Sequence, residues 1–284
     1  MNKFGIFINP LHENTHPVFS LLEKLHKNYN LQFYKLTSQK DFLPDFVKCI
    51  DEPSHQKLDC ILVFGGDGTI LRAIDFSLQT KAPLLGINIG KLGFLSESTL
   101  SNLEKSIENL EKNKFKVQER LLIKVILKRK KRVIFSSLAL NDAVIYKGKD
   151  PKLMEVSFFT NRRLVVETRC DGIIASTPTG STAYSLSAGG PILSPLMEAL
   201  VVAPLNPHVL TVRPMVFSAK DNLLFKIIKT NDESVLQLDG KNSFSLESGD
   251  EILVSAANKK VNFIKLSNKT FYQILRKKLH MGRK

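Results

Sequence analysis

The sequence has few cysteines and no long apolar run. Its three cysteines, Cys49, Cys60 and Cys170, form no CxxC pair and leave an odd one over, which is typical of thiols in a reducing compartment. The apolar run at residues 4–8 is stopped by Asn9 and Pro10 and is too short for a signal peptide. No apolar run approaches the roughly 18 residues that a membrane span needs. We therefore predict a cytoplasmic protein with no membrane partner.

Two common glycine motifs of nucleotide-binding proteins are also missing. A P-loop needs GxxxxGK[ST], whereas residues 86–92 have three residues between their glycines and a leucine after Lys91. The glycine-rich segment at residues 65–69 does not contain GxGxxG, so ordinary Rossmann dinucleotide binding lacks its fingerprint. No metal-ligand spacing is present either, and the ligands of any metal stay unassigned.

The composition is that of a packed globular protein with an unusual charge. The chain has 284 residues, 43% of them hydrophobic and 24% charged, which suits one large or two ordinary domains. The net charge of +14 comes from two acid-free segments, residues 124–132 and 259–284, and the rest is close to neutral. Neither segment carries an aromatic RNA motif, zinc spacing or a recognition helix, so we predict no nucleic-acid partner.

The first hundred residues alternate between strand and helix patterns. Strands are predicted at residues 4–8, 31–36, 60–64 and 82–89, and helices at 16–26 and 41–50. Short, continuously apolar strands between helices favour a parallel sheet covered on both faces. We therefore predict a Rossmann-like parallel α/β domain over residues 1–99.

The pattern changes after residue 100. One amphipathic helix is expected at residues 100–112. Alternating strands follow at 122–127, 133–140, 144–147, 155–160, 164–166, 223–228, 235–238, 251–254 and 261–266. The basic cluster at 129–132 falls between two strands, as a solvated hairpin tip would. We predict a β-rich, β-sandwich domain over residues 100–266, and a basic C-terminal helix and tail, 267–284, that returns to the first domain.

The sequence Gly65-Gly66-Asp67-Gly68-Thr69 follows an apolar strand and precedes a predicted helix at 69–76. Ligands of open α/β sheets bind at this end of the strands, and glycines let backbone amides approach phosphate oxygens. A carboxylate among them, Asp67, could accept the proton of a hydroxyl during phosphoryl transfer. Arg72 could add positive charge near phosphate or be a solvated helix residue. A tight turn capped by Asp67 is the structural alternative.

Residues 176–185 contain seven hydroxyl side chains, with glycine and proline fixing the turn. A helix beginning near Ser181 or Thr182 would direct its free amides at an anion, and Tyr184 offers a face to an aromatic base. Arg169 and Asp171 stand at the mouth of the same segment. A capped turn without ligand is the alternative.

Asn141 and Asp142 interrupt an apolar stretch. Within a strand they would point to opposite faces, and burying both needs a reason. At a strand end both could accept hydrogen bonds from a ribose diol. Polar residues at a sheet edge or turn remain the alternative.

Together these motifs resemble the NAD kinase family over roughly residues 60–215. The resemblance also includes Leu92-Gly93-Phe94-Leu95 and Pro207-His208 followed by Arg213-Pro214. The chain departs from the family at three positions, where Asp142, Lys91 and Ile89 replace the more frequent Glu, His and Leu.

The resemblance implies transfer of the ATP γ-phosphoryl group to the adenosine ribose 2′-hydroxyl of NAD, giving NADP. Asp67 would accept the proton beside Gly68, Asn141 and Asp142 would hold the ribose, and Arg169 and Asp171 would line the dinucleotide site. The implied nucleotide-binding set also contains Arg72, Lys152, Thr182, Ala183, Tyr184, Ser185, Leu186, Ser187 and Lys241. The family further implies a divalent cation, Mg²⁺ with ATP, and a homodimer or homotetramer.

Two other functions share part of these motifs. A lipid kinase of the diacylglycerol or sphingosine type would have the GGDGT loop, and a non-catalytic dinucleotide-binding protein would keep the hydroxyl-rich segment. Conversion of NAD to NADP would exclude the lipid kinase, and any catalytic turnover would exclude the non-catalytic binding protein.

Overall fold

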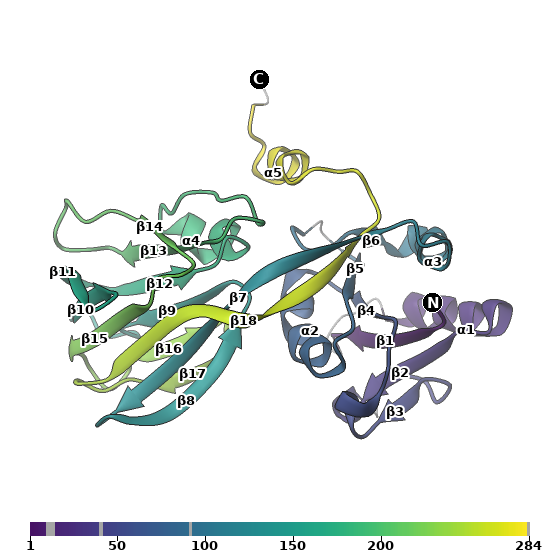
Figure 1. Cartoon of the computed structure of the whole chain (residues 1–284), viewed down its shortest axis with the longest axis horizontal. Helices are drawn as coiled ribbons and strands as arrows, with labels where there is room; N and C mark the ends of the chain where they lie inside the picture. The colour runs from purple at the N-terminus through teal and green to yellow at the C-terminus, as the bar shows by residue number, and fades with distance from the viewer. Residues whose placement is uncertain (10–14, 40–41, 91–92, 283–284) are drawn as a thin grey trace. The chain divides into compact units, whose positions relative to one another are not determined.

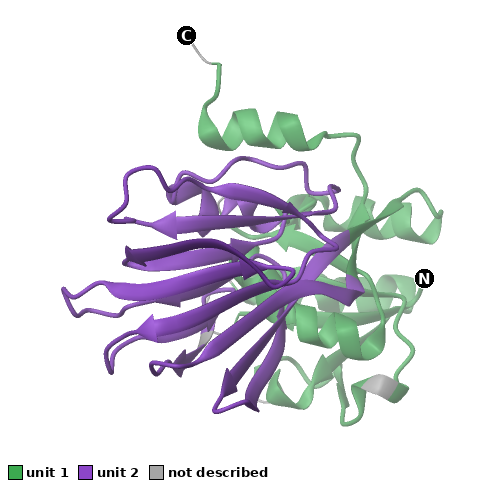
Figure 2. Cartoon of the chain, turned by 60° about the vertical axis from the view of Figure 1, so that its left-hand side comes forward, with its two compact units in different colours: residues 1–119, 261–284 green, residues 120–260 purple. Residues whose placement is uncertain are grey.

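The computed structural model describes residues 1–9, 15–39, 42–90 and 93–282. It divides into two compact units, of which unit 1 comprises Met1–Glu119 with Val261–Lys284 and unit 2 comprises Arg120–Lys260 (Figure 2). Strands β7 (Lys116–Arg129) and β18 (Glu251–Lys265) each begin in one unit and end in the other. Lys91 and Leu92, noted above, lie outside the described residues. No described helix is long and apolar enough to cross a membrane.

Unit 1 contains a parallel sheet with the order β3-β2-β1-β4-β5 (Figure 1). Its strands are β1 (Lys3–Ile8), β2 (Gln32–Leu36), β3 (Lys48–Ile50), β4 (Cys60–Phe64) and β5 (Leu84–Asn88). Every residue of β4 and β5 is buried, as expected for strands covered on both faces. The helices are α1 (His16–Tyr29), α2 (Asp67–Thr80) and α3 (Leu103–Glu111), and β6 (Ser98–Thr99) pairs with β5. The predicted parallel α/β fold is confirmed.

The helix predicted at residues 41–50 is wrong. In the described part of this segment, a turn closed by the Val47 amide on the Pro44 carbonyl leads into β3, which pairs with β2. Proline has no amide to donate and disfavours helical backbone in the residue before it. The apolar spacing that suggested a helix comes from Leu43 and Val47, which pack into the unit 1 core from a loop.

Unit 1 extends beyond the predicted domain boundary at residue 99. Helix α3 packs Leu103, Ile107 and Leu110 into the same core as β1 and β4. The C-terminal segment also belongs to this unit: the end of β18 pairs with β5 in parallel, and α5 (Phe271–Leu279) follows it. The chain therefore builds unit 1 from both of its ends, because the core of the α/β sheet recruits segments far apart in sequence.

Unit 2 is a β-sandwich, as predicted. One sheet is antiparallel with the order β14-β13-β12-β9-β16-β17, and the other contains β11-β10-β15-β18 with β7 and β8 attached. The bounds are β8 (Arg132–Ala139), β9 (Asp142–Tyr146), β10 (Met154–Thr160), β11 (Arg163–Cys170), β12 (Gly172–Ser176), β13 (Ala199–Leu205), β14 (Met215–Ser218), β15 (Leu223–Lys229), β16 (Val235–Leu238) and β17 (Lys241–Ser245). Inward side chains of both sheets, such as Ile145 and Phe225, form one core.

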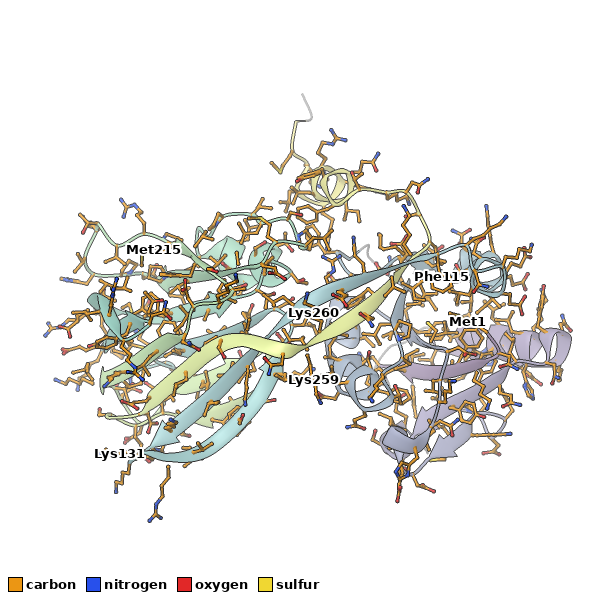
Figure 3. All side chains as sticks on the ribbon, viewed as in Figure 1. Met1, Phe115, Lys131, Met215, Lys259 and Lys260 are labelled. Atoms are coloured by element: carbon orange, nitrogen blue, oxygen red, sulfur yellow. The ribbon has the colours of Figure 1, made fainter. Side chains whose placement is uncertain are left out.

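The basic hairpin between β7 and β8 turns at Lys130 and Lys131, which both have positive φ, as a two-residue hairpin turn requires. Figure 3 shows Lys131 at the exposed end of this hairpin. Arg129 differs from its neighbours, because its guanidinium donates to the buried carboxylate of Asp250 at 2.8 and 2.9 Å. Lys131 and Arg132 are exposed as predicted for a solvated tip, while Arg129 pairs with buried Asp250.

Candidate active site

Asp67 is the first residue of α2, directly after the Gly65-Gly66 turn that ends β4. Its Oδ2 accepts the amide of Phe94 at 2.8 Å, and its Oδ1 accepts the amide of Leu95 at 3.0 Å. Gly66, not Asp67, occupies the N-cap position of α2. The structural alternative of a helix-capping aspartate is therefore wrong, and the half-buried carboxylate is instead oriented by two amides from a different segment.

The glycines around Asp67 have two different surroundings. Among the described residues, a Cβ added to Gly66 or Gly68 would meet no atom within 4 Å, so the backbone there is open to a ligand. A Cβ added to Gly93 would overlap the carboxylate of Asp67. Gly93 thus allows the Phe94 and Leu95 amides to approach Asp67, whereas Gly66 and Gly68 leave room in front of it. Arg72 is exposed on α2 of the same unit.

In unit 2, the segment before β9 is held by the carboxylate of Asp239. Asp239 Oδ2 accepts the Leu140 amide at 2.8 Å, and its Oδ1 accepts the amides of Asn141 and Asp142 at 2.7 and 3.1 Å. The Asp239 amide donates back to the Asp142 carbonyl at 3.1 Å. All four contacts involve the backbone of residues 140–142. Asp239 therefore fixes the position of the backbone that carries the Asn141 and Asp142 side chains.

Asp239 is not among the site residues predicted from the sequence. It lies with Gly240 in the turn between β16 and β17, and both residues have positive φ. Asp-Gly between two apolar strands is a hairpin signal, so the turn could have been found. Its partner, the segment that connects β8 to β9, could not, because those two strands belong to different sheets. Burial raises the pKa of Asp239, and the three backbone amides that it accepts, together with the charge of Lys241 after the turn, act in the opposite direction.

Asp142 begins β9 and is 4% exposed. Burial raises its pKa to about 7, and the negative charge of Asp239 contributes in the same direction. This carboxyl therefore changes its protonation close to neutral pH. In the ionised form it is a strong acceptor for a hydroxyl donor, because few other groups solvate it.

The hydroxyl-rich segment contains β12, a 3-10 turn (Gly180–Thr182) and α4 (Tyr184–Ser187). Several of its polar groups bond within unit 2: the Thr177 amide and the Ser176 hydroxyl donate to the Asn141 carbonyl, and the Ser181 hydroxyl accepts the Leu193 amide. Gly180 packs so tightly on the Asn141 backbone that a Cβ would overlap it. The segment is thus fastened to the residue that precedes Asp142.

A helix is predicted to begin near Ser181 or Thr182. The structure has instead the 3-10 turn at Gly180–Thr182 and the single turn of α4, which is too short for the predicted anion site at a helix end. Buried hydroxyls of Thr179 and Ser185 have no hydrogen-bond partner among the described residues. Tyr184 and Ser187 are exposed, Thr182, Ala183 and Leu186 are partly exposed, and Ser185 is fully buried. The predicted nucleotide-covering residues therefore divide into an outer and an inner set.

Arg169 and Asp171 have separate partners. Arg169 pairs with Glu155 at 2.9 Å beside a cavity of about 350 Å³ whose lining includes Thr168 and His208. Asp171 pairs with Lys147 at 3.2 Å and accepts the Asn206 side-chain amide at 2.8 Å. Lys152 is exposed just before β10, in the same unit. Each of these predicted residues is on unit 2, but the structure does not gather them around one group.

Two family profiles match the chain. The ATP-NAD kinase N-terminal domain matches residues 4–115, and the ATP-NAD kinase C-terminal domain matches residues 140–266. An NAD kinase from Aquifex aeolicus is 37% identical over 264 residues, which cover 93% of this chain and 94% of that protein. An NAD kinase from Desulforamulus reducens is 38% identical over 221 residues, which cover 78% and 77%.

Two solved structures are similar to this chain. The crystal structure of yeast NADH kinase complexed with NADH has a TM-score of 0.89 at 25% identity and covers all of this chain and 89% of that one. An NAD kinase from Archaeoglobus fulgidus in complex with ATP has a TM-score of 0.74 at 23% identity and covers 98% of both chains. The second likeness supports the fold.

Proposed function

The chain belongs to the NAD kinase family, and from that premise we propose that it transfers the γ-phosphoryl group of ATP to the adenosine ribose 2′-hydroxyl of NAD, yielding NADP. The observation that carries the proposal is the carboxylate of Asp67, held by two amides in front of open glycine backbone. The family match favours this reaction over lipid phosphorylation and over dinucleotide binding without catalysis.

Asp67 acts as the proton acceptor in this proposal. The 2′-oxygen forms a bond to the γ-phosphorus, the bond from that phosphorus to the β–γ bridging oxygen breaks, and ADP leaves. The hydroxyl proton passes to Asp67 as transfer proceeds and then to solvent. The Phe94 and Leu95 amides support this role, because each occupies one lone-pair direction of an oxygen and leaves the others for the substrate hydroxyl. Positioning, more than basicity, supplies the rate.

Unit 2 supplies the proposed dinucleotide contacts. Asn141 and Asp142 accept hydrogen bonds from ribose hydroxyls, and Asp239 supports them by fixing the backbone from which they project. Residues Thr182 to Ser187 cover adenine and ribose, with the exposed ring of Tyr184 available for stacking. Arg169, Asp171, Lys152, Lys241 and, from unit 1, Arg72 complete the proposed binding set.

A divalent cation, Mg²⁺ in our proposal, enters with ATP. Among the described residues no group of three His, Cys, Asp or Glu side chains could hold a metal ion. These residues fit a cation held chiefly by the phosphates. Such an ion, when bound, offsets the negative charge of the phosphates.

One assay tests the function. The purified chain is incubated with Mg²⁺ and NAD, with ATP or inorganic polyphosphate as donor, and NADP is measured with an NADP-specific dehydrogenase. Parallel reactions replace NAD with NADH, diacylglycerol or sphingosine. We expect NADP with ATP and no lipid phosphate. Lipid phosphorylation without NADP would establish the lipid kinase, and NAD binding without turnover would establish the non-catalytic protein.

We also propose a cytoplasmic location and a homodimer or homotetramer. The family membership supports the second proposal. Sedimentation equilibrium of the purified chain measures its mass directly, and a monomer at the concentration of the assay would contradict self-association.

A further inference from the structure

Unit 1 contains a second cavity, of about 630 Å³, that includes none of the predicted site residues. Its wall is built by residues 96–109, which run from β6 into α3, and by residues 266–277, which run from the end of β18 into α5. All of these residues lie in unit 1. The volume is in the range of small-molecule sites.

Three lysines give the cavity a positive charge. Lys105 projects from α3, Lys269 from the loop before α5 and Lys277 from α5, and none has an ion-pair partner among the described residues. The acidic residue in the wall, Glu97, is already compensated. It pairs with Lys265 and accepts the amides of Leu266 and Ser267 at 3.1 and 2.7 Å. The lysine charges are therefore available to a ligand.

The rest of the wall combines two chemistries. Ser98, Thr99 and Asn102 supply hydroxyl and amide groups, and Leu266 and Ile274 supply apolar surface. Clustered ammonium groups suit a multiply charged anion, while the apolar side suits an organic group attached to it. We propose that this cavity binds an organic phosphate of nucleotide size with three or more negative charges, at a site separate from the one assigned to catalysis.

The cavity is joined to Asp67 through one short segment. Phe94 and Leu95 orient the Asp67 carboxylate with their amides, and the next residues, 96–99, form part of the cavity wall. The Lys278 ammonium of α5 lies 4.7 Å from the centre of the Phe94 ring. A ligand that contacts residues 96–99 and α5 therefore acts on the segment that positions Asp67. This coupling, unlike the binding itself, rests on the proposed function.

Residue-resolved lysine protection tests the binding. The full chain is acetylated briefly with and without ATP, tripolyphosphate or adenosine, and modification of each lysine is quantified by mass spectrometry. We expect ATP to protect Lys105, Lys269 and Lys277 with one shared saturation curve, tripolyphosphate to protect them at higher concentration, and adenosine to leave them reactive. The exposed control lysines of unit 1, Lys48, Lys57 and Lys114, should stay reactive throughout.

A matched pair of variants sharpens the test. Lys269→Gln should raise the ATP concentration needed to protect Lys105 and Lys277 about tenfold, because a charge-assisted contact is lost, and Lys57→Gln should leave it unchanged. Equal protection of all six lysines, protection by adenosine, or no response to Lys269→Gln would overturn the proposal. Because protection needs no turnover, a chain that fails to make NADP could still confirm the site.

Hydrogen exchange tests the coupling. ATP should slow amide exchange in residues 93–99 of the native chain and of Lys57→Gln, and should do so about tenfold less effectively in Lys269→Gln. Equal slowing in all three would show that the segment responds to ATP bound elsewhere and would overturn the coupling.

Discussion

The two units hold their acidic residues in opposite ways. In unit 1, the Asp67 carboxylate accepts two backbone amides and is half-buried between Gly66 and Gly68, around which the described residues leave open space. In unit 2, Asp142 is almost fully buried, and its pKa is raised by burial and by the charge of Asp239. A Cβ added to Gly180 would overlap the backbone of Asn141, the residue before Asp142. The Asp67 carboxylate therefore stays accessible, whereas the Asp142 carboxyl is buried, where ionisation is unfavourable, on a backbone segment fixed by Asp239.

This difference matches the two tasks in the proposed reaction. A proton acceptor must meet the substrate hydroxyl as the bond forms, so access and orientation matter most. A group that holds a ribose gains from burial, because its hydrogen bonds then compete less with water. The comparison predicts that unit 1 substitutions damage turnover, while unit 2 substitutions change stability and binding.

The largest expected effect is that of Asp67→Asn. The amide has nearly the same shape but cannot accept the proton, so kcat should fall about 1,000-fold or more while NAD binding changes little. Steady-state kinetics and calorimetric titration of NAD measure the two effects. Near-normal turnover would refute the proton-acceptor role and remove the main contrast between the units.

Gly93→Ala should come next. The added methyl group overlaps the Asp67 carboxylate, so the carboxylate must move away from the Phe94 and Leu95 amides. A displacement of this kind costs about 100-fold in kcat, with a smaller change in the Michaelis constant for NAD. Thermal unfolding serves as the control, and a kcat that falls only in proportion to the folded fraction would contradict a positioning effect.

Gly180→Ala and Gly68→Ala form a matched pair. At Gly180 the methyl group meets the Asn141 backbone, and the free energy of unfolding should fall by about 2–3 kcal/mol. At Gly68, inside α2, the methyl group enters open space, so stability should hold or rise while turnover falls, because substrate approaches there. Urea unfolding of both variants decides the matter. Equal destabilisation would show that the two glycines do not differ as proposed.

Asp142→Asn should have the smallest effect, with an unusual sign. The folded-state pKa of Asp142, about 7, lies above its unfolded value, so its contribution to stability is complete at low pH and is lost as pH rises through 7. At pH 8 the variant should therefore be more stable than the native chain, although its Michaelis constant for NAD should rise. Urea unfolding at pH 5 and pH 8 measures the difference. An equal or lower stability at pH 8 would indicate that Asp142 is not destabilised by its charge.

Local pattern was sufficient for much of the fold. Strands β4 and β5 were predicted from continuous apolar runs, which arise because both faces of these strands are buried. Helix α3 was predicted from apolar residues three or four positions apart, because only one of its faces is buried. Local pattern failed at residues 42–50, where loop side chains reach the core with a helix-like spacing. It also could not show that α3 and the C-terminal segment complete unit 1, since that depends on contacts between distant parts of the chain.

The site was predictable to a similar degree. The glycines marked Asp67, and the paired polar residues marked Asn141 and Asp142, because such residues are unusual next to apolar strands. The partners of these residues were not predictable. Asp239 follows Asp142 by 97 positions and Phe94 follows Asp67 by 27, and no sequence period connects them. The roles of the individual site residues remain predictions for the experiments above.

The assembly of unit 1 from both ends of the chain has a consequence for its synthesis. During translation, the edge of β5 that receives β18 and the carboxylate of Glu97 must wait for residues 261–267, after the whole β-sandwich has left the ribosome. Unit 2 is continuous and can fold first. A chain interrupted in unit 2 would therefore lack the strand that pairs with β5 and the amides of Leu266 and Ser267 that bind Glu97, two residues after Leu95.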